Sequence, residues 1–515
     1  MCTDGQFVSQ WRFPRDVGLR VDYDDRTPFG SPITTAAAER TRSLFQSAID
    51  HVRAHGLGGL HGSVHRLLDA VIAGDDFAAI AERHDDRWSL RAGVLYPDAQ
   101  DAPPVSVAME RSNGAHLSAM VDTATWPILH DWIASLSNEG LADVPEIPTV
   151  LRDFLEALAE RGLVERCECP PTDARVVGDL TFVGHNSVLV DSGSTRVIAD
   201  PFLFAEDDAH PRQYQPLSVR QLAPIDAVVI THSHPDHFDP ASLLRFPSDI
   251  RVIVPVVERE TILTTDMARR LAELGFSNVH AMAWGESTTV GDVEISALAF
   301  FGEQPTDGDV LHPEVSNHGN TYVVRTPTFG VALLADSGRD HRGDVRDVAT
   351  SWFRAAGPVD VVLSGYRGWA TYPPLHLLSS VAPFFLFAPR ASWSSRQQLM
   401  NSVADAVDVA ERFGATTLIP YGDGGAPWHW QIGLGPRLDG SGVDDDNFDP
   451  YPEHVAAAAR NRVRTPSGER LGSSVEVVLL HPGESLLGLG TAPRVVRHRG
   501  HEWPFATAFD YSHGG

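Results

Sequence analysis

The sequence predicts an α/β protein in which an αββα sandwich follows a mixed α/β N-terminal domain. From residue 180 onward, short apolar runs of strand length alternate with glycine-containing turns and with helical segments. Each candidate metal ligand comes shortly after one of these apolar runs, where a strand is expected to end. Layers of helix, sheet, sheet and helix accommodate this alternation.

A change of composition near residues 168–174 predicts a boundary between two domains, residues 1–175 and residues 176–515. Two prolines and the pair Cys167 and Cys169 interrupt the pattern there. Before this boundary we expect helices at 62–73, 75–84, 123–136 and 150–164, and strands at 88–95, 105–111 and 115–121. No catalytic constellation precedes residue 175, so we expect the N-terminal domain to be structural, regulatory or an interface.

The length, composition and net charge of the chain argue against several classes of protein. The chain has 515 residues, of which 43% are hydrophobic, and a formal net charge of −27. Because phosphate backbones are bound by basic surfaces, this charge argues against nucleic-acid binding. We expect no membrane segment, since no apolar run approaches roughly 20 residues, and no secretory leader. Three cysteines cannot form a disulfide framework, so a cytoplasmic protein is expected.

Residues 226–239 hold the densest group of chemically competent side chains. An apolar run at 227–230 predicts a buried strand, and four candidate ligands follow it at once: His232, His234, Asp236 and His237. Imidazole and carboxylate together suit zinc, iron or manganese. His232 and His234 alternate and can face one ion, while the next two ligands lie further round the turn and can face a second. One short segment can therefore serve two metals.

The spacing His-x-His-x-Asp-His resembles the signature of the metallo-β-lactamase superfamily. A structural zinc site is disfavoured because such sites are closed and rich in cysteine. The segments 184–187 and 198–201 are similar to the opening of this fold in its phosphodiesterase-like branches. In that context His185 packs near the site and is not a ligand.

The superfamily resemblance implies three further ligands. Asp336 ends a strand-like run before a glycine-containing turn, and it fits the bridging carboxylate. His376, in a loop after another run, fits the last ligand of the second metal. For the remaining ligand of the first metal, hydrolases of the superfamily place a histidine where this chain has Glu303. His318 and His312 lie nearby and stay open as alternatives.

The identity of that ligand decides the chemistry. With Glu303 the site holds four histidines and three carboxylates, and a hard anionic ligand favours iron and its oxidised forms. With His318 the site holds five histidines and two carboxylates, which suits two zinc ions that activate a water for hydrolysis.

The combination of Glu303 with the histidine cluster resembles a particular branch, the non-haem diiron aminoacyl β-hydroxylases of nonribosomal peptide assembly, of the type found in chloramphenicol biosynthesis. This resemblance implies an enzyme with two iron ions that uses dioxygen to hydroxylate the β-carbon of an amino acid. Glu303 and Asp336 would be central to catalysis. The implied ligands are His232, His234 and Glu303 for one iron, Asp236, His237 and His376 for the other, and Asp336 as the bridge.

The same resemblance implies the partners. The amino acid would be carried as a thioester on a peptidyl carrier domain, and electrons would come from an external donor protein. The chain would form a homodimer to which the N-terminal domain contributes. Carrier domains are usually acidic, so docking needs a local basic patch, for which Arg212, Arg220 and Arg339 are candidates; they can equally be ordinary surface residues. No glycine-rich fingerprint for a flavin or nicotinamide is found. Aromatic residues in loops after strands could wall a substrate pocket: Trp369, Tyr372, Trp428 and Trp430.

Two other functions of the protein stay open as alternatives. A dizinc hydrolase would cleave a phosphodiester, a lactone or a thioester with the same fold. A non-enzymatic scaffold with a degenerate site is the third, and it is disfavoured because no expected ligand of the second metal is missing.

Overall fold

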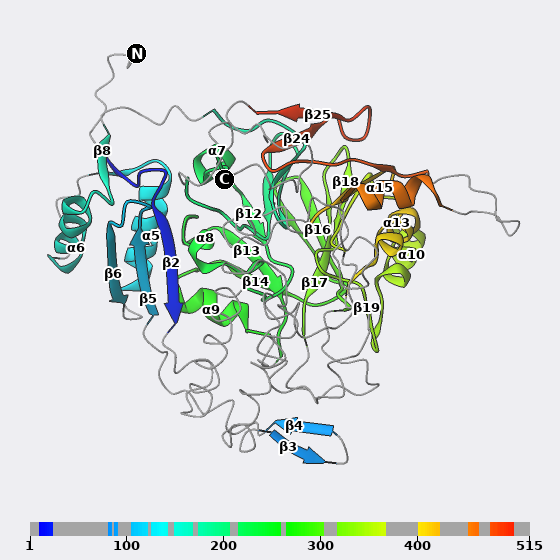
Figure 1. Cartoon of the computed structure of the whole chain (residues 1–515), viewed down its shortest axis with the longest axis horizontal. Helices are drawn as coiled ribbons and strands as arrows, with labels where there is room; N and C mark the ends of the chain where they lie inside the picture. The colour runs from blue at the N-terminus through cyan, green and yellow to red at the C-terminus, as the bar shows by residue number, and fades with distance from the viewer. Residues whose placement is uncertain are drawn as a thin grey trace, which may run out of the picture.

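The computed structural model describes residues 10–23, 81–84, 87–90, 105–121, 125–142, 149–167, 174–206, 215–258, 264–302, 317–366, 400–422, 452–462 and 474–498. Within these ranges two large sheets lie face to face, with helices on their outer sides (Figure 1). The predicted αββα sandwich is therefore confirmed.

The first sheet has eight strands in the order β14-β13-β12-β11-β10-β9-β24-β25. Strands β11 to β14 run parallel, whereas β9 and β10 form an antiparallel pair. The strands are β9 (Leu180–Gly184), β10 (Ser187–Asp191), β11 (Arg196–Ala199), β12 (Ala227–Val229), β13 (Arg251–Pro255), β14 (Val279–Met282), β24 (Glu484–Leu487) and β25 (Arg494–Arg497).

The second sheet has seven strands in the order β15-β16-β17-β18-β21-β22-β23. Its strands are β15 (Ser287–Val290), β16 (Val293–Ala299), β17 (Asn320–Arg325), β18 (Gly330–Leu333), β21 (Val361–Ser364), β22 (Thr417–Pro420) and β23 (Glu476–Val477). A small hairpin follows β18, formed by β19 (Arg339–Asp340) and β20 (Gly343–Asp344).

The core lies between the two sheets and on both of their outer faces. Val188 and Val229 of the first sheet share one apolar cluster with Ile295 and Leu333 of the second. Because the central strands are covered on both faces, they appear in the sequence as continuous apolar runs rather than as alternating patterns. The outer helices are α7 (Val219–Leu222), α8 (Pro240–Leu243) and α9 (Met267–Glu273) on one side, and α10 (Val345–Ala356), α13 (Val403–Arg412) and α15 (Pro452–Arg460) on the other.

The N-terminal part forms smaller sheets. Strands β2 (Gly18–Tyr23), β5 (Val105–Glu110) and β6 (His116–Val121) make one sheet, and β1 (Gln10–Arg12), β7 (Leu141–Ala142) and β8 (Glu165–Cys167) make another. The helices α5 (Trp126–Ser137) and α6 (Thr149–Glu160) confirm two of the predicted helices.

One apolar cluster joins this part to the large domain. Trp126 and Leu129 of α5 belong to the same cluster as Leu243 and Phe246. Nε2 of His130 also lies 2.9 Å from the carbonyl oxygen of Phe246. The division at residue 175 stays a prediction, since the two parts share this core.

The helix predicted at 75–84 is wrong over its described residues. Ala81–His84 is strand β3, which pairs with β4 (Arg87–Leu90) in an antiparallel hairpin. Cross-strand pairing therefore overrides the local helical pattern. The helix predicted at 62–73 lies outside the described residues. Within the described part of the chain, no helix combines the length and apolarity needed to cross a membrane.

Candidate metal centre

The histidine cluster lies in a tight loop between β12 and α8. Backbone bonds from His237 N and Phe238 N to the carbonyl oxygen of His234 close the loop. The Asp239 carboxylate then caps α8, accepting bonds from the backbone N–H groups of Ala241 and Ser242. The strand end and the helix cap together fix the backbone that carries the predicted ligands.

The first group of candidate ligands is His232, His234 and Asp336, all of them buried. Nε2 of His232 lies 2.9 Å from Nδ1 of His234 and 4.0 Å from Oδ2 of Asp336. Their ligand atoms all lie within 4.8 Å of one another, so a single ion can contact all three.

The second group is His185, Asp236 and His237. Nε2 of His185 lies 2.7 Å from Oδ2 of Asp236, and Nε2 of His237 lies 3.8 Å from the same oxygen. His185 packs beside the site, as predicted, but its position within this group means that it could itself contact an ion. That His185 is not a ligand therefore stays a prediction.

Asp336 connects the two groups. Its Oδ2 atom, 4.0 Å from Nε2 of His232, is also 3.3 Å from Nε2 of His237. Asp336 follows Ala335, whose positive φ of 46° turns the chain at the end of β18. The buried hydroxyl of Tyr421 accepts a 2.8 Å hydrogen bond from Ala335 N. One carboxylate thus lies within reach of both groups, an arrangement suited to a pair of metal ions.

Asp200 supports the second group from behind. Its carboxylate accepts hydrogen bonds from Thr231 N at 2.7 Å and from the Thr231 hydroxyl at 2.6 Å. It also lies 2.8 Å from Nδ1 of His237. A proton on Nδ1 satisfies that contact and leaves Nε2 directed at the centre as a lone-pair donor. This role of Asp200 was not predicted; its only signal in the sequence is an Asp-Pro pair directly after a strand-like run.

The electrostatics favour a cation. Burial lowers the pKa of His237, but three neighbouring carboxylates outweigh burial and raise it well above its ordinary value. Those carboxylates belong to Asp336, Asp236 and Asp200. In addition, Oδ1 of Asp236 and Oδ1 of Asp336 are buried and have no hydrogen-bond partner among the described residues. Because buried carboxylate oxygens are rarely left unpaired, these residues fit bound metal ions.

Three of the predicted or alternative ligands, Glu303, His376 and His312, lie outside the described residues, as do Arg212 and the aromatic residues Trp369, Tyr372, Trp428 and Trp430. The strand end that leads to Glu303 is described. Phe301 N donates to the Ser337 hydroxyl at 3.1 Å, and Gly302 N donates to Oδ2 of Asp340 at 3.0 Å. The backbone before Glu303 therefore lies beside the turn that carries Asp336.

The competing ligand His318 is described and belongs to neither group. Its backbone N–H donates to the Thr264 hydroxyl at 3.0 Å. Burial, followed by the positive charge of Arg342, lowers the pKa of its imidazole. Whether Glu303 or His318 is the third ligand beside His232 and His234 stays a prediction.

Fold and site together define a metallo-β-lactamase-fold protein whose His and Asp groups can hold two metal ions. Residues 186–421 match the family model described as a beta-lactamase superfamily domain.

Among solved structures, the chain is similar to CmlA, a diiron β-hydroxylase from Streptomyces venezuelae. The TM-score is 0.58 and the identity 17%, and the match covers 95% of this chain and 100% of that one. A variant of CmlA matches with a TM-score of 0.54. The predicted resemblance to this branch is thus confirmed at the level of the fold.

Two curated relatives match parts of the sequence. A Mycolicibacterium smegmatis protein named as a Rieske 2Fe-2S iron-sulfur protein is 25% identical over 301 residues, which is 56% of this chain and 51% of the relative. The Streptomyces venezuelae 3-hydroxylase of 4-amino-L-phenylalanyl CmlP peptidyl-carrier protein is 28% identical over 188 residues, 36% of this chain and 33% of the relative. The matches therefore span about half and one third of these relatives.

Proposed function

We propose that the protein is an oxygen-dependent diiron monooxygenase that hydroxylates the β-carbon of an amino acid tethered as a thioester to a peptidyl carrier domain. The proposal of two metal ions rests on the position of Asp336, whose Oδ2 atom faces both His232 and His237. The proposal that these ions are redox-active iron depends on Glu303. In the sequence Glu303 follows Phe301 and Gly302, and Phe301 N is hydrogen-bonded to Ser337 in the turn that carries Asp336.

The comparisons support the substrate class. The fold similarity to a diiron β-hydroxylase extends over nearly the whole chain, N-terminal part included. The curated 3-hydroxylase is named for an aminoacyl substrate on a carrier protein. A carrier domain, an electron-donor protein and a second copy of the chain are the partners that this proposal includes, in the cytoplasm.

In this proposal each residue has a defined task. One iron is assigned to His232, His234 and Glu303, the other to Asp236, His237 and His376, with Asp336 between them. When bound, the iron pair would pass two electrons from the external donor to dioxygen, so that one oxygen atom enters the C–H bond and the other leaves as water. Asp200 holds the His237 imidazole so that Nε2 faces the centre. Phe300, with its ring centroid 5.1 Å from that of His232, excludes water from one side.

A dizinc hydrolase is the second candidate. The same His and Asp groups suit zinc, and the matching family model is that of the beta-lactamase superfamily. The described ligands are common to both candidates, so the identity of the bound metal distinguishes them.

Metal analysis of the purified protein together with its absorption spectrum separates the two candidates. We expect about two iron ions per chain and a near-ultraviolet band from ferric iron that bleaches on reduction. Stoichiometric zinc without this band would overturn the oxygenase proposal and favour the hydrolase. As a control for unspecific loading, the Asp336→Asn variant should lose the paired-metal signature.

A further inference from the structure

The turn between β9 and β10 brings a side-chain amide to the second ligand group. β9 ends at Gly184 and β10 begins at Ser187, so His185 and Asn186 form the tip of an antiparallel hairpin. His185 has a positive φ of 54°, a conformation that two-residue hairpin turns adopt at their first position. Asn186 is only 1% exposed. The hairpin therefore holds the Asn186 amide inside the protein.

The amide of Asn186 faces the imidazole of His237. Its Nδ2 atom lies 2.9 Å from Nε2 of His237, while the other ring nitrogen is engaged by Asp200 at 2.8 Å. Nε2 is therefore the ring atom available to a metal ion. Two carboxylate oxygens lie further from it, that of Asp336 at 3.3 Å and that of Asp236 at 3.8 Å. The amide is thus closer to this nitrogen than either of these candidate ligands.

The carbonyl oxygen of Asn186 is an unpaired acceptor. Oδ1 is buried and has no hydrogen-bond partner among the described residues. It lies against Gly422, where an added Cβ atom would be only 2.4 Å away. Leaving a buried amide oxygen unpaired costs free energy, and an unpaired buried acceptor is a feature of sites that bind an ion.

A half-turn of the amide directs this oxygen at the centre. Rotation about the Cβ–Cγ bond exchanges Oδ1 and Nδ2 and keeps the shape of the side chain. Beside an ion bound to Nε2 of His237, an amide N–H group would present its positive end to a positive charge, whereas the carbonyl oxygen is attracted to that charge. Gly422, which has no Cβ atom, leaves the amide room to turn.

We propose that Asn186 is a ligand of the second metal ion, bound through its carbonyl oxygen beside Asp236 and His237. Amide carbonyl oxygens, like carboxylates, are hard ligands for metal ions. Asn186 adds such a ligand without adding negative charge to a site that already holds the carboxylates of Asp236 and Asp336. The proposal rests on the two-metal site of the proposed function, and it holds for iron and for zinc alike.

The test is titration of the full-length, metal-free protein with Co²⁺ against a competing chelator under anaerobic conditions. The visible absorption of Co²⁺ depends on the geometry and kind of its ligands, so the spectrum follows each bound ion. In Asn186→Ala we expect the affinity for the second ion to fall at least about tenfold, while the first ion binds as in the unmodified protein. Asn186→Asp keeps an oxygen at the same place, so it should bind the second ion at least as tightly, with a changed spectrum.

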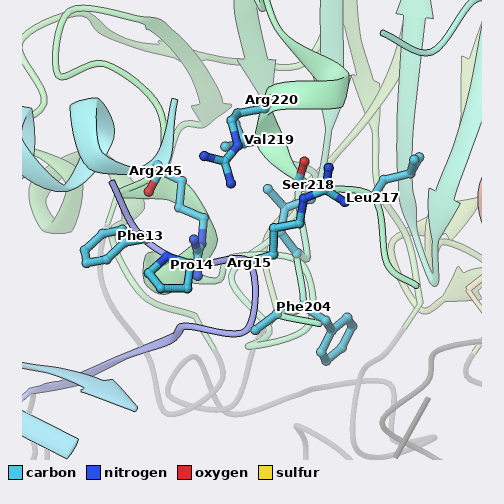
Figure 2. Close-up of a pocket in the computed structure, with 12 residues that line it drawn as sticks. Phe13, Pro14, Arg15, Phe204, Leu217, Ser218, Val219, Arg220 and Arg245 are labelled. Atoms are coloured by element: carbon cyan, nitrogen blue, oxygen red, sulfur yellow. The ribbon is translucent and has the colours of Figure 1, made fainter. Parts of the chain in front are cut away.

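Ser137→Ala is the matched control. Ser137 is 4% exposed, and its hydroxyl oxygen also has no hydrogen-bond partner among the described residues. It lines the cavity beside Arg15 and Arg245 that Figure 2 shows, and the residues that line this cavity belong to neither ligand group. The substitution removes a buried polar atom of the same kind away from the ligands, so Ser137→Ala should bind both ions as the unmodified protein does.

Equal affinity of the unmodified protein and Asn186→Ala for the second ion would overturn the proposal, as would an equal loss in Asn186→Ala and Ser137→Ala. An Asn186→Asp variant that loses the second ion would also overturn it, and this result is informative even if Asn186→Ala disturbs the hairpin. An unmodified protein that binds only one ion would contradict the two-metal site of the proposed function, and this proposal with it. The two failures are therefore distinguishable.

Discussion

Asp200 and His237 are joined by a contact of 2.8 Å between the carboxylate Oδ2 atom and the imidazole Nδ1 atom. Both side chains are buried, at 1% and 0% exposure. The contact is possible because β11 and β12 run parallel with Ala199 beside Val229, so that their carboxyl ends lie together. Asp200 determines which nitrogen of His237 is presented to the centre.

Replacing Asp200 with Asn tests this arrangement. The substitution keeps the shape, and Asn tolerates the positive φ of 41° at this position. We expect affinity for the second metal to fall about 10- to 100-fold, since outer partners of metal-bound histidines have effects of this size. Titration against a competing chelator measures it. Asp191→Asn, which removes a carboxylate paired with Arg196 at 2.7 Å in the same sheet, is the control and should leave metal affinity unchanged.

Glu303→His tests the proposed redox role. A histidine would give the first metal the ligand set of a hydrolase, so we expect the variant to bind two metal ions but to lose oxygen-dependent hydroxylation. Metal content and oxygen consumption with a reductant measure the two properties separately. Full hydroxylation by the variant would show that Glu303 is not a ligand, and Glu303→Asp, which keeps the charge, should retain part of the activity.

The raised pKa of His237 predicts a pH dependence for the metal-free protein. In the unfolded chain this histidine titrates near pH 6.5, and in the folded protein its pKa lies well above that value. Protonation therefore stabilises the fold fully below about pH 6.5, and this contribution is lost as the pH rises through the raised pKa. Denaturant unfolding of the metal-free protein should give a lower free energy of unfolding at about pH 9 than at pH 6.5.

Metal-loaded protein is the control for this experiment, because a bound cation takes the place of the proton on His237. Its free energy of unfolding should not fall in the same way over this range. A metal-free protein equally stable at both pH values would contradict the assigned environment of His237.

Local sequence patterns were sufficient to predict most of the sandwich strands and the loop that holds His232 to His237. A buried apolar run followed at once by ligands is a local signal, and β12 has this form. Asp336 could also be predicted from the local sequence, as a carboxylate at the end of a strand. The structure places it within reach of both groups. Its role as a bridge stays a prediction.

Features that depend on long-range pairing could not be predicted in this way. Strand β24 pairs with β9, with Ser485 opposite Thr181. A local sequence pattern cannot predict pairing between strands so far apart in the chain. The support of His237 by Asp200 depends on the pairing of β11 with β12. At Ala81–His84 the local pattern predicted a helix, but the segment is a strand because it pairs with β4.

Replacing Gly422 tests the packing around the second group of ligands, because Gly422 lies close to Asn186. It has a φ of 75°, and a Cβ atom added there would lie 2.4 Å from Oδ1 of Asn186. Asn186 Nδ2 is itself 2.9 Å from Nε2 of His237. Gly422→Ala should therefore press the amide toward the imidazole, weaken binding of the second metal and destabilise the fold by about 1–3 kcal/mol. Gly193→Ala is the matched control, since Gly193 has a φ of 93° but no atom within 4 Å of the added Cβ. It should share the backbone cost in chemical denaturation and keep the affinity for metal, and equal losses of metal affinity in the two variants would rule out the contact with Asn186 as the cause.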